Sequence, residues 1–201
     1  MPRSLPSRRT RRCEPVTQPD RVAAALAHYA SIGHARSVPG DPIPDDYPAH
    51  VEAALGIILP PAYRRFLAAY PCTGGPDAVV RSPIISPDSG AMAGLLEFFG
   101  YAADRDDLIA RNRSPHDFEI PGMIIVADDA GGNPFYLDLA SGEIWFCDRV
   151  DSVPGARKGL ALVGTDFADF LLRMEVDPEG DVIPGPPQRT LWQRLTGWIA
   201  P

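Results

Sequence analysis

The chain has 201 residues, of which 45% are hydrophobic and 22% charged, and its formal net charge is −7. These values are typical of one soluble globular domain with tails, and no apolar run is long enough to span a bilayer. The three cysteines are far apart and form no C-x-x-C pair, which argues against a disulfide framework or a zinc site and indicates a reducing cytoplasm.

The charge is unevenly distributed along the chain. Residues 1–12 hold five of the 19 basic residues and no acid, so 14 bases face 26 acids in the remainder. Such a body repels nucleic acid and favours a cationic protein partner, although solubility alone explains the same charge. The segment "SRRTRR" resembles a twin-arginine signal, but a polar stretch follows it. We expect no export, and a disordered basic arm over residues 1–19.

Helical patterns dominate the first third of the domain. Asp20 is placed to cap a helix that ends at Gly33, and a proline-rich connector follows over residues 34–48. A short helix interrupted by Gly56 precedes a second one that starts at Pro61, a residue suited to a first helical turn. The second helix has one apolar stripe, formed by Leu59, Tyr63, Phe66, Leu67 and Tyr70.

Strand patterns follow. Residues 78–85 and 95–101 are candidate strands, although 95–101 also fits a helix, and 104–113 predicts a short helix. Alternating apolar residues predict strands over 122–127, 134–139 and 143–149, with a tight turn that uses Gly142 between the last two.

The C-terminal part begins with a helix over residues 166–174, for which Thr165 is the expected cap. A linker over residues 176–189 and an amphipathic helix over 190–201 follow; its apolar face either packs on the domain or anchors a partner. That face is formed by Leu191, Trp192, Leu195, Trp198 and Ile199. The layout predicts an α+β fold: a single domain over residues 20–175, with a central antiparallel-rich sheet flanked by N-terminal helices and a C-terminal helix.

The stretch from Asp128 to Asn133, "DDAGGN", is the strongest candidate for chemistry. Two adjacent carboxylates invite a divalent cation, but the stretch lacks the alternating acids and terminal glutamate of a calcium loop. It also lacks the lysine and following helix of a phosphate-binding loop. We therefore interpret it as a turn between two strands, in which glycine supplies unusual backbone angles, and predict no metal site.

Motifs for catalysis and nucleic-acid binding are missing. The sequence holds no G-x-S-x-G or H-E-x-x-H pattern, and its four histidines lie outside any catalytic frame. The arginine arm has no interleaved aromatic residues. We expect no catalytic residue, no cofactor, no nucleic acid and no membrane contact.

Four segments in order resemble the SUKH superfamily, the Smi–Knr type. They are "VEAALGIILPPAYRRFLAAYPCTGG", "LLEFFGYAADRDDLIARNR", "IPGMIIVADDAGGNPFYLDLASGEIWFCDRVD" and "LVGTDFADFLLRM", and together they span about residues 46–175. The chain departs from the family pattern after the aromatic strand, where Cys147, Asp148 and Arg149 replace the usual Trp-Asp-His.

The resemblance implies a non-catalytic α+β domain. Bacterial members resemble immunity proteins that bind and neutralise toxins, and fungal members resemble regulators of cell-wall synthesis and signalling. One lysine among 19 basic residues favours a GC-rich bacterial genome and hence the immunity branch. A regulator or scaffold without a toxin is the alternative, and a metal enzyme using Asp128 and Asp129 is a third. The expected contact residues for a cationic toxin domain are Asp45, Asp46, Asp128, Asp129, Asn133, Trp145 and Asp148.

Overall fold

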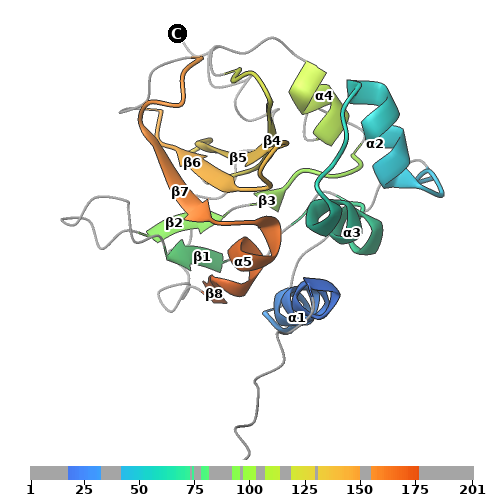
Figure 1. Ribbon diagram of the computed structural model, residues 1–201, viewed down its shortest axis with the longest axis horizontal. Coiled ribbons are helices and arrows are strands. Elements are labelled where there is room, and N and C mark those ends of the chain that lie inside the picture. Colours follow the sequence, from blue (N-terminus) through green and yellow to red (C-terminus); the bar gives the residue numbers. More distant parts are fainter. Residues whose placement is uncertain are drawn as a thin grey trace, which may run out of the picture.

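A computed structural model describes residues 18–32, 42–72, 74, 78–81, 92–95, 97–102, 107–113, 119–129, 131–149 and 155–176. Most of the predicted basic arm, the linker from residue 177 on and the predicted C-terminal helix lie outside the described residues. The described part contains five helices and eight strands, which Figure 1 shows as one α+β domain. This confirms the predicted fold class.

The helices are α1 (Gln18–Ser31), α2 (Tyr47–Leu55), α3 (Pro61–Ala69), α4 (Leu108–Arg113) and α5 (Phe167–Leu172). The strands are β1 (Ala78–Arg81), β2 (Met92–Leu95), β3 (Glu97–Phe98), β4 (Met123–Asp128), β5 (Pro134–Asp138), β6 (Ile144–Cys147), β7 (Leu160–Gly164) and β8 (Met174–Val176).

Local sequence explains where most helices begin and end. The Asp46 carboxylate accepts a hydrogen bond from the Ala49 N–H at 3.1 Å and starts α2. Gly56 ends α2 in the left-handed conformation, at φ 67°. Pro61 occupies the first turn of α3, as predicted, and no side chain caps that helix.

Two predicted helix starts are wrong. Helix α1 begins at Gln18, so Asp20 lies within its first turn and is not the residue that precedes it. Helix α5 is capped by Asp166 and not by Thr165, because the Asp166 carboxylate accepts the Asp169 N–H at 2.7 Å. That helix also ends before Met174, which begins β8.

All strand pairs in the two described sheets are antiparallel. One sheet has the order β3-β4-β5-β6-β7 and the other β2-β1-β8. The ambiguous segment 95–101 forms strand residues at the end of β2 and in β3. Strands β7 and β8 were not predicted: residues 160–164 had been assigned to no element, and Met174 of β8 had been placed at the end of a helix.

Helices α1, α3 and α5 lie together on one side of the five-stranded sheet (Figure 1). Their shared core is aromatic: the Phe66 ring lies 5.2 Å from Tyr29, 4.8 Å from Phe98 and 5.0 Å from Phe167, between ring centroids. Tyr29 belongs to α1 and is 1% exposed. Helix α1 is therefore part of the core and not an appendage.

The opposite face of the sheet is also covered. All five residues of β5 are buried, including Tyr136 and Asp138, whereas alternation had predicted one polar face. Arg111 of α4 reaches Asp128 at 3.8 Å, and Arg157 reaches Asp138 at 2.6 Å. Because two layers cover β5, its polar side chains are buried with partners and do not face solvent.

Candidate functional site

The loop between β4 and β5 is held together by Asp129. One oxygen of its carboxylate accepts the N–H groups of Gly131 and Asn133, each at 2.8 Å, and the other accepts the Asn133 side-chain amide at 2.9 Å. Gly132 has a φ of 77°, which favours glycine. The predicted turn between two strands is confirmed, and Asp129 is the side chain that shapes it.

The same loop is joined to the end of β6. The Asn133 side-chain oxygen accepts the Arg149 N–H at 3.1 Å. Asp129, Asn133 and Asp148, three of the predicted contact residues, therefore lie together at one end of the sheet. Asp148 is half-buried.

Trp145 lies in the middle of β6, opposite Tyr136 of β5 and Leu162 of β7. Its indole is half-buried against the core, and the buried Nε1 atom has no hydrogen-bond acceptor among the described residues. Trp145 thus stands on the sheet face, away from the turn that holds Asp129.

Asp128 differs from the expectation of an exposed carboxylate. Its side chain is 15% exposed and lies 3.8 Å from Arg111, whose guanidinium also stacks over the Phe99 ring at 5.2 Å. Helix α4 packs beside β4 and covers this carboxylate, so Asp128 first of all joins α4 to the sheet.

Asp45 and Asp46 lie at the start of α2. Asp46 caps the helix and pairs with Arg64 at 3.2 Å, and its side chain is 61% exposed. Arg64 also pairs with Glu52 at 3.4 Å. Asp45 is exposed. Asp45 and Asp46 thus belong to the start of α2, whereas Asp129 belongs to the loop between β4 and β5.

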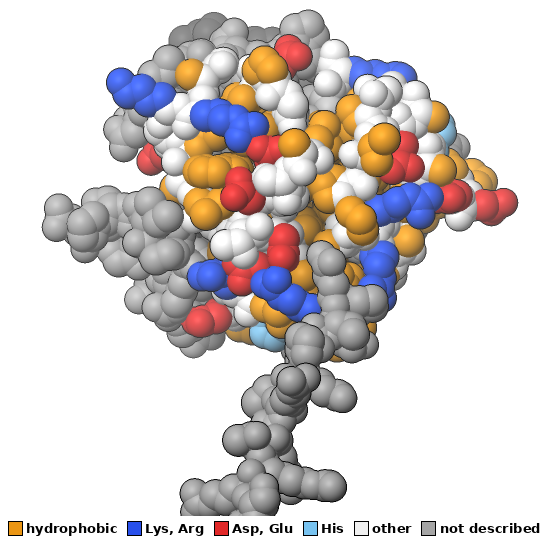
Figure 2. Space-filling model, in the orientation of Figure 1, with side chains coloured by type: hydrophobic (Ala, Val, Ile, Leu, Met, Phe, Trp, Pro, Cys, Tyr) orange, Lys and Arg blue, Asp and Glu red, His pale blue; other side chains and the backbone are white. Residues whose placement is uncertain are grey.

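Figure 2 shows acidic and basic side chains interspersed on one face of the molecule, with apolar side chains between them. Among the described residues, no group of three or more His, Cys, Asp or Glu side chains is arranged to hold a metal ion. In the same part of the chain, every helix is too short or too polar to cross a membrane.

A comparison with protein families identifies the domain that carries these features. A sequence model of the SMI1 / KNR4 family (SUKH-1) matches residues 42–173, which is more than half of the chain. The chain belongs to the SMI1/KNR4 family. No match was found among curated proteins or among solved structures.

The SMI1/KNR4 match begins after α1, which therefore lies outside it. Helix α1 is nevertheless fixed to the family domain by ion pairs. Arg21 contacts Asp166 at 2.7 Å and Asp169 at 3.4 Å, and Asp169 also pairs with Arg173 at 2.8 Å. This network joins α1 to the N-terminal half of α5.

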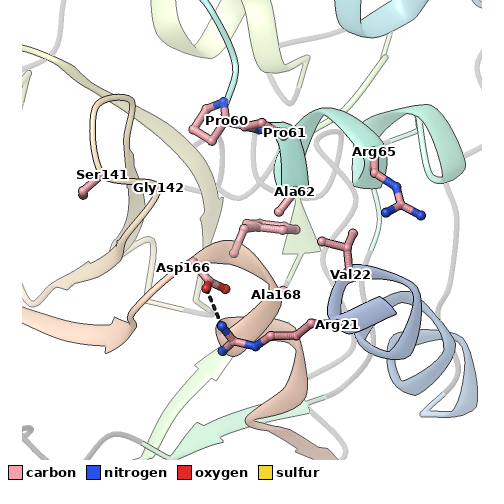
Figure 3. A pocket seen from close by; sticks show the side chains of 11 residues that line it. Arg21, Val22, Pro60, Pro61, Ala62, Arg65, Ser141, Gly142, Asp166 and Ala168 are labelled. Carbon is pink, nitrogen blue, oxygen red and sulfur yellow. Dashed lines mark hydrogen bonds and ion pairs between the residues drawn. The ribbon is translucent and has the colours of Figure 1, made fainter. Parts of the chain in front are cut away.

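A hollow of about 320 Å³ lies where α1 meets the SMI1/KNR4 domain (Figure 3). Its apolar lining comes from Val22, Pro60, Pro61, Ala62, Phe167 and Ala168. Arg21, Arg65 and Asp166 also line it, and the Ser141–Gly142 turn closes one side. The sequence analysis missed this pocket, because its walls come from four separate segments of the chain.

The turn that closes the pocket is fixed by Asp138. This buried carboxylate accepts the N–H groups of Ala140 at 2.9 Å and Ser141 at 3.3 Å, and pairs with Arg157 at 2.6 Å. Burial acts to raise the pKa of Asp138, but these hydrogen bonds outweigh it and hold the pKa below its usual value. The carboxylate is therefore charged and serves as the anchor of the hairpin.

Proposed function

We propose that this chain is a non-catalytic protein-binding domain, an immunity protein that binds and neutralises a cognate bacterial toxin. The observation that carries the proposal is the SMI1/KNR4 match over residues 42–173. The described fold supports the proposal, because polar side chains at the end of the sheet form hydrogen bonds that fix the conformation of the loop there. A preformed loop surface binds a protein without a large cost of ordering.

The proposed contact surface is the end of the sheet that carries the Asp129 loop and Asp148, with Asp45, Asp46 and Trp145 as further contacts. Acids at this surface complement a cationic toxin domain and speed its approach. In this proposal Asp129 acts mainly by holding the turn, and Asp128 acts mainly by joining α4 to the sheet through Arg111.

The experiment uses the product of the adjacent open reading frame. Co-expression of the chain with this product should restore growth if the product is toxic, and the purified proteins should form a stable 1:1 complex. Asp148→Lys should lower the association rate several-fold at low salt and have less effect at high salt. Glu175→Lys, an exposed acid in β8, is the matched control.

A toxic neighbour that forms no complex with the chain would contradict the proposal. Equal association rates for Asp148→Lys and Glu175→Lys would remove Asp148 from the contact surface. Restored growth without a physical complex would favour the alternative of a regulator with no toxin partner.

A further inference from the structure

The surface where α2 and α4 lie side by side has no part in the loop surface proposed above (Figure 1). It carries a projecting loop tip, Gly56–Ile58, and next to it a hollow of about 240 Å³, the α2–α4 hollow. We propose that this surface binds a second copy of the chain across a two-fold axis, so that the tip of each copy enters the α2–α4 hollow of the other. The inference does not depend on the toxin partner.

The tip presents the most exposed large apolar side chain of the described residues. Ile58 is 83% exposed, although it lies between a half-buried Ile57 and a buried Leu59. The Glu52 backbone carbonyl accepts the Ile57 N–H at 3.1 Å, and the Glu52 carboxylate accepts the Leu59 N–H at 3.0 Å. The tip is therefore preformed, and burial of Ile58 by a partner needs little ordering of the loop.

The α2–α4 hollow matches an apolar occupant. Its polar residue Asn112 is engaged, because the side-chain oxygen accepts the Ile125 N–H at 2.8 Å and the nitrogen donates to the Leu108 and Ile125 carbonyls at 2.9 Å each. At about 240 Å³ the hollow is smaller than the roughly 300–1,000 Å³ of small-molecule sites. It is wider than one isoleucine side chain, so the whole tip, in which Gly56 has no side chain, is the matching occupant. The apolar lining includes Leu55, Ile57, Ile120, Met123 and Leu139.

Two charged groups at the margin of the α2–α4 hollow select a second copy as the partner. Glu119 lines the hollow and is exposed, and no cation among the described residues pairs with it. Arg113 follows the lining residue Asn112 and is also exposed. Its guanidinium donates to the neutral Ala54 carbonyl at 2.6 Å and contacts no carboxylate of the described part. A two-fold axis can bring the Arg113 of each copy to the Glu119 of the other and form two ion pairs at once.

This pairing also limits the repulsion between two acidic chains. The net charge of −7 opposes self-association in general. Arg113 and Glu119 have opposite charges, so together they add no excess of acid at the contact, and a strongly cationic partner gains little there. Because the contact consists of two tips and two ion pairs, we expect a dissociation constant on the order of 10 to 100 µM.

Sedimentation velocity of the full chain measures this self-association. As the concentration rises through the expected dissociation constant, the sedimentation coefficient should pass from that of one chain to that of two. Ile58→Lys places a charge in the α2–α4 hollow and should raise the dissociation constant at least about tenfold. Val176→Lys, which changes a 57% exposed aliphatic residue of β8, is the matched control and should leave the dissociation constant unchanged.

A charge exchange tests the two-fold arrangement itself. Glu119→Arg and Arg113→Glu each place like charges opposite each other across the axis, so each variant alone should be monomeric. An equimolar mixture of the two variants should form a heterodimer, because every pair across the axis then joins opposite charges. This recovery should weaken as the salt concentration rises. Ion pairing within one chain cannot produce recovery in the mixture.

Several results would overturn the inference. They are a parent chain that stays monomeric up to about 500 µM, an equal effect of Ile58→Lys and Val176→Lys, or a mixture of the charge variants that stays monomeric. Circular dichroism should show that all variants keep the parent fold, since the changed side chains are exposed. None of these results bears on the proposed function, which is tested by the complex with the adjacent gene product.

Two other occupants are tested with the same variants. If the parent chain is monomeric and Ile58→Lys weakens a complex with the adjacent gene product, the surface belongs to that partner. If Trp192→Ala abolishes self-association as completely as Ile58→Lys, the contact belongs to the C-terminal segment. Either result would overturn the assignment of the α2–α4 hollow to the tip of a second copy.

Discussion

Replacing Asp138 with alanine tests the link between one buried carboxylate and the whole hairpin of β5 and β6. Asp138 is 4% exposed and accepts two turn N–H groups, from Ala140 and Ser141, in addition to the Arg157 guanidinium. The substitution removes all three interactions at once and leaves a small cavity. It leaves the apolar core residues of β5 unchanged.

The size of the effect depends on how well each donor that loses the Asp138 carboxylate can form a hydrogen bond with water instead. The Arg157 side chain is 51% exposed, so its guanidinium becomes solvated and its loss contributes well under 1 kcal/mol. The two turn N–H groups and the cavity account for most of the cost, and each lost hydrogen bond to a charged acceptor contributes about 1.5 kcal/mol. We expect a loss of about 2–3 kcal/mol in the free energy of unfolding, or roughly 4–12 °C in Tm.

Urea denaturation followed by circular dichroism measures this loss. Asp138→Asn keeps one acceptor oxygen and should lose about half as much, while Arg157→Gln alone should lose less than about 1 kcal/mol. A double-mutant cycle of the two sites isolates the ion pair. An Asp138→Ala variant within 0.5 kcal/mol of the parent, or an Arg157→Gln variant as unstable as it, would refute the reasoning.

The dependence of stability on acidic pH is an independent test of the role of Asp138. The pKa of Asp138 is lower in the folded chain than its ordinary value of about 3.9, so its contribution to stability is present above that value. The contribution is lost as the pH falls through the folded pKa. Between about pH 5 and pH 2, the parent should therefore lose more stability than Asp138→Asn. Parallel pH curves for the two proteins would contradict the assigned hydrogen bonds.

Three further predictions concern other parts of the molecule. Asp129→Ala should destabilise by about 1–2 kcal/mol and broaden the amide signals of residues 131–133, since the loop loses three hydrogen bonds; unchanged signals would argue against it. Gly164→Ala should destabilise by about 1–3 kcal/mol in thermal unfolding, because a Cβ there would lie 2.7 Å from the Cβ of Phe170. Burial raises the pKa values of Tyr47 and Tyr63, so an ultraviolet titration should show both ionising only on unfolding, with stability falling above about pH 10.

Local sequence patterns predicted those helix ends and turns whose conformation depends on residues close together in the sequence. Gly56 and Pro61 marked the end of α2 and the start of α3, and one glycine in each of the two turns, Gly132 and Gly142, adopts the positive φ that was expected. The family resemblance over residues 46–175 is confirmed by the match over 42–173. These features were readable because backbone preferences and short-range hydrogen bonds act over a few residues.

The exposure of polar side chains was less predictable. Alternation placed Asp138 on a polar face, and Asp128 was expected to be free for a partner, but α4 and Arg157 cover that side of the sheet. Strand β8 was not predicted, and Met174 was expected at the end of a helix, because the pairing of β8 with β1 is a contact between distant segments. A single sequence gives no sign of which segments meet.

By itself, the sequence determined the fold class, the family, the turn at Asp129, the end of α2 and the start of α3, since each depends on residue order and short-range contacts. Only the tertiary structure decided which carboxylates are buried and that α1 joins the core. It alone brought α1, the start of α3, the hairpin turn and the start of α5 together around one pocket. The physical reason is that burial and pockets arise from packing between segments far apart in the chain, and such packing leaves no local periodicity.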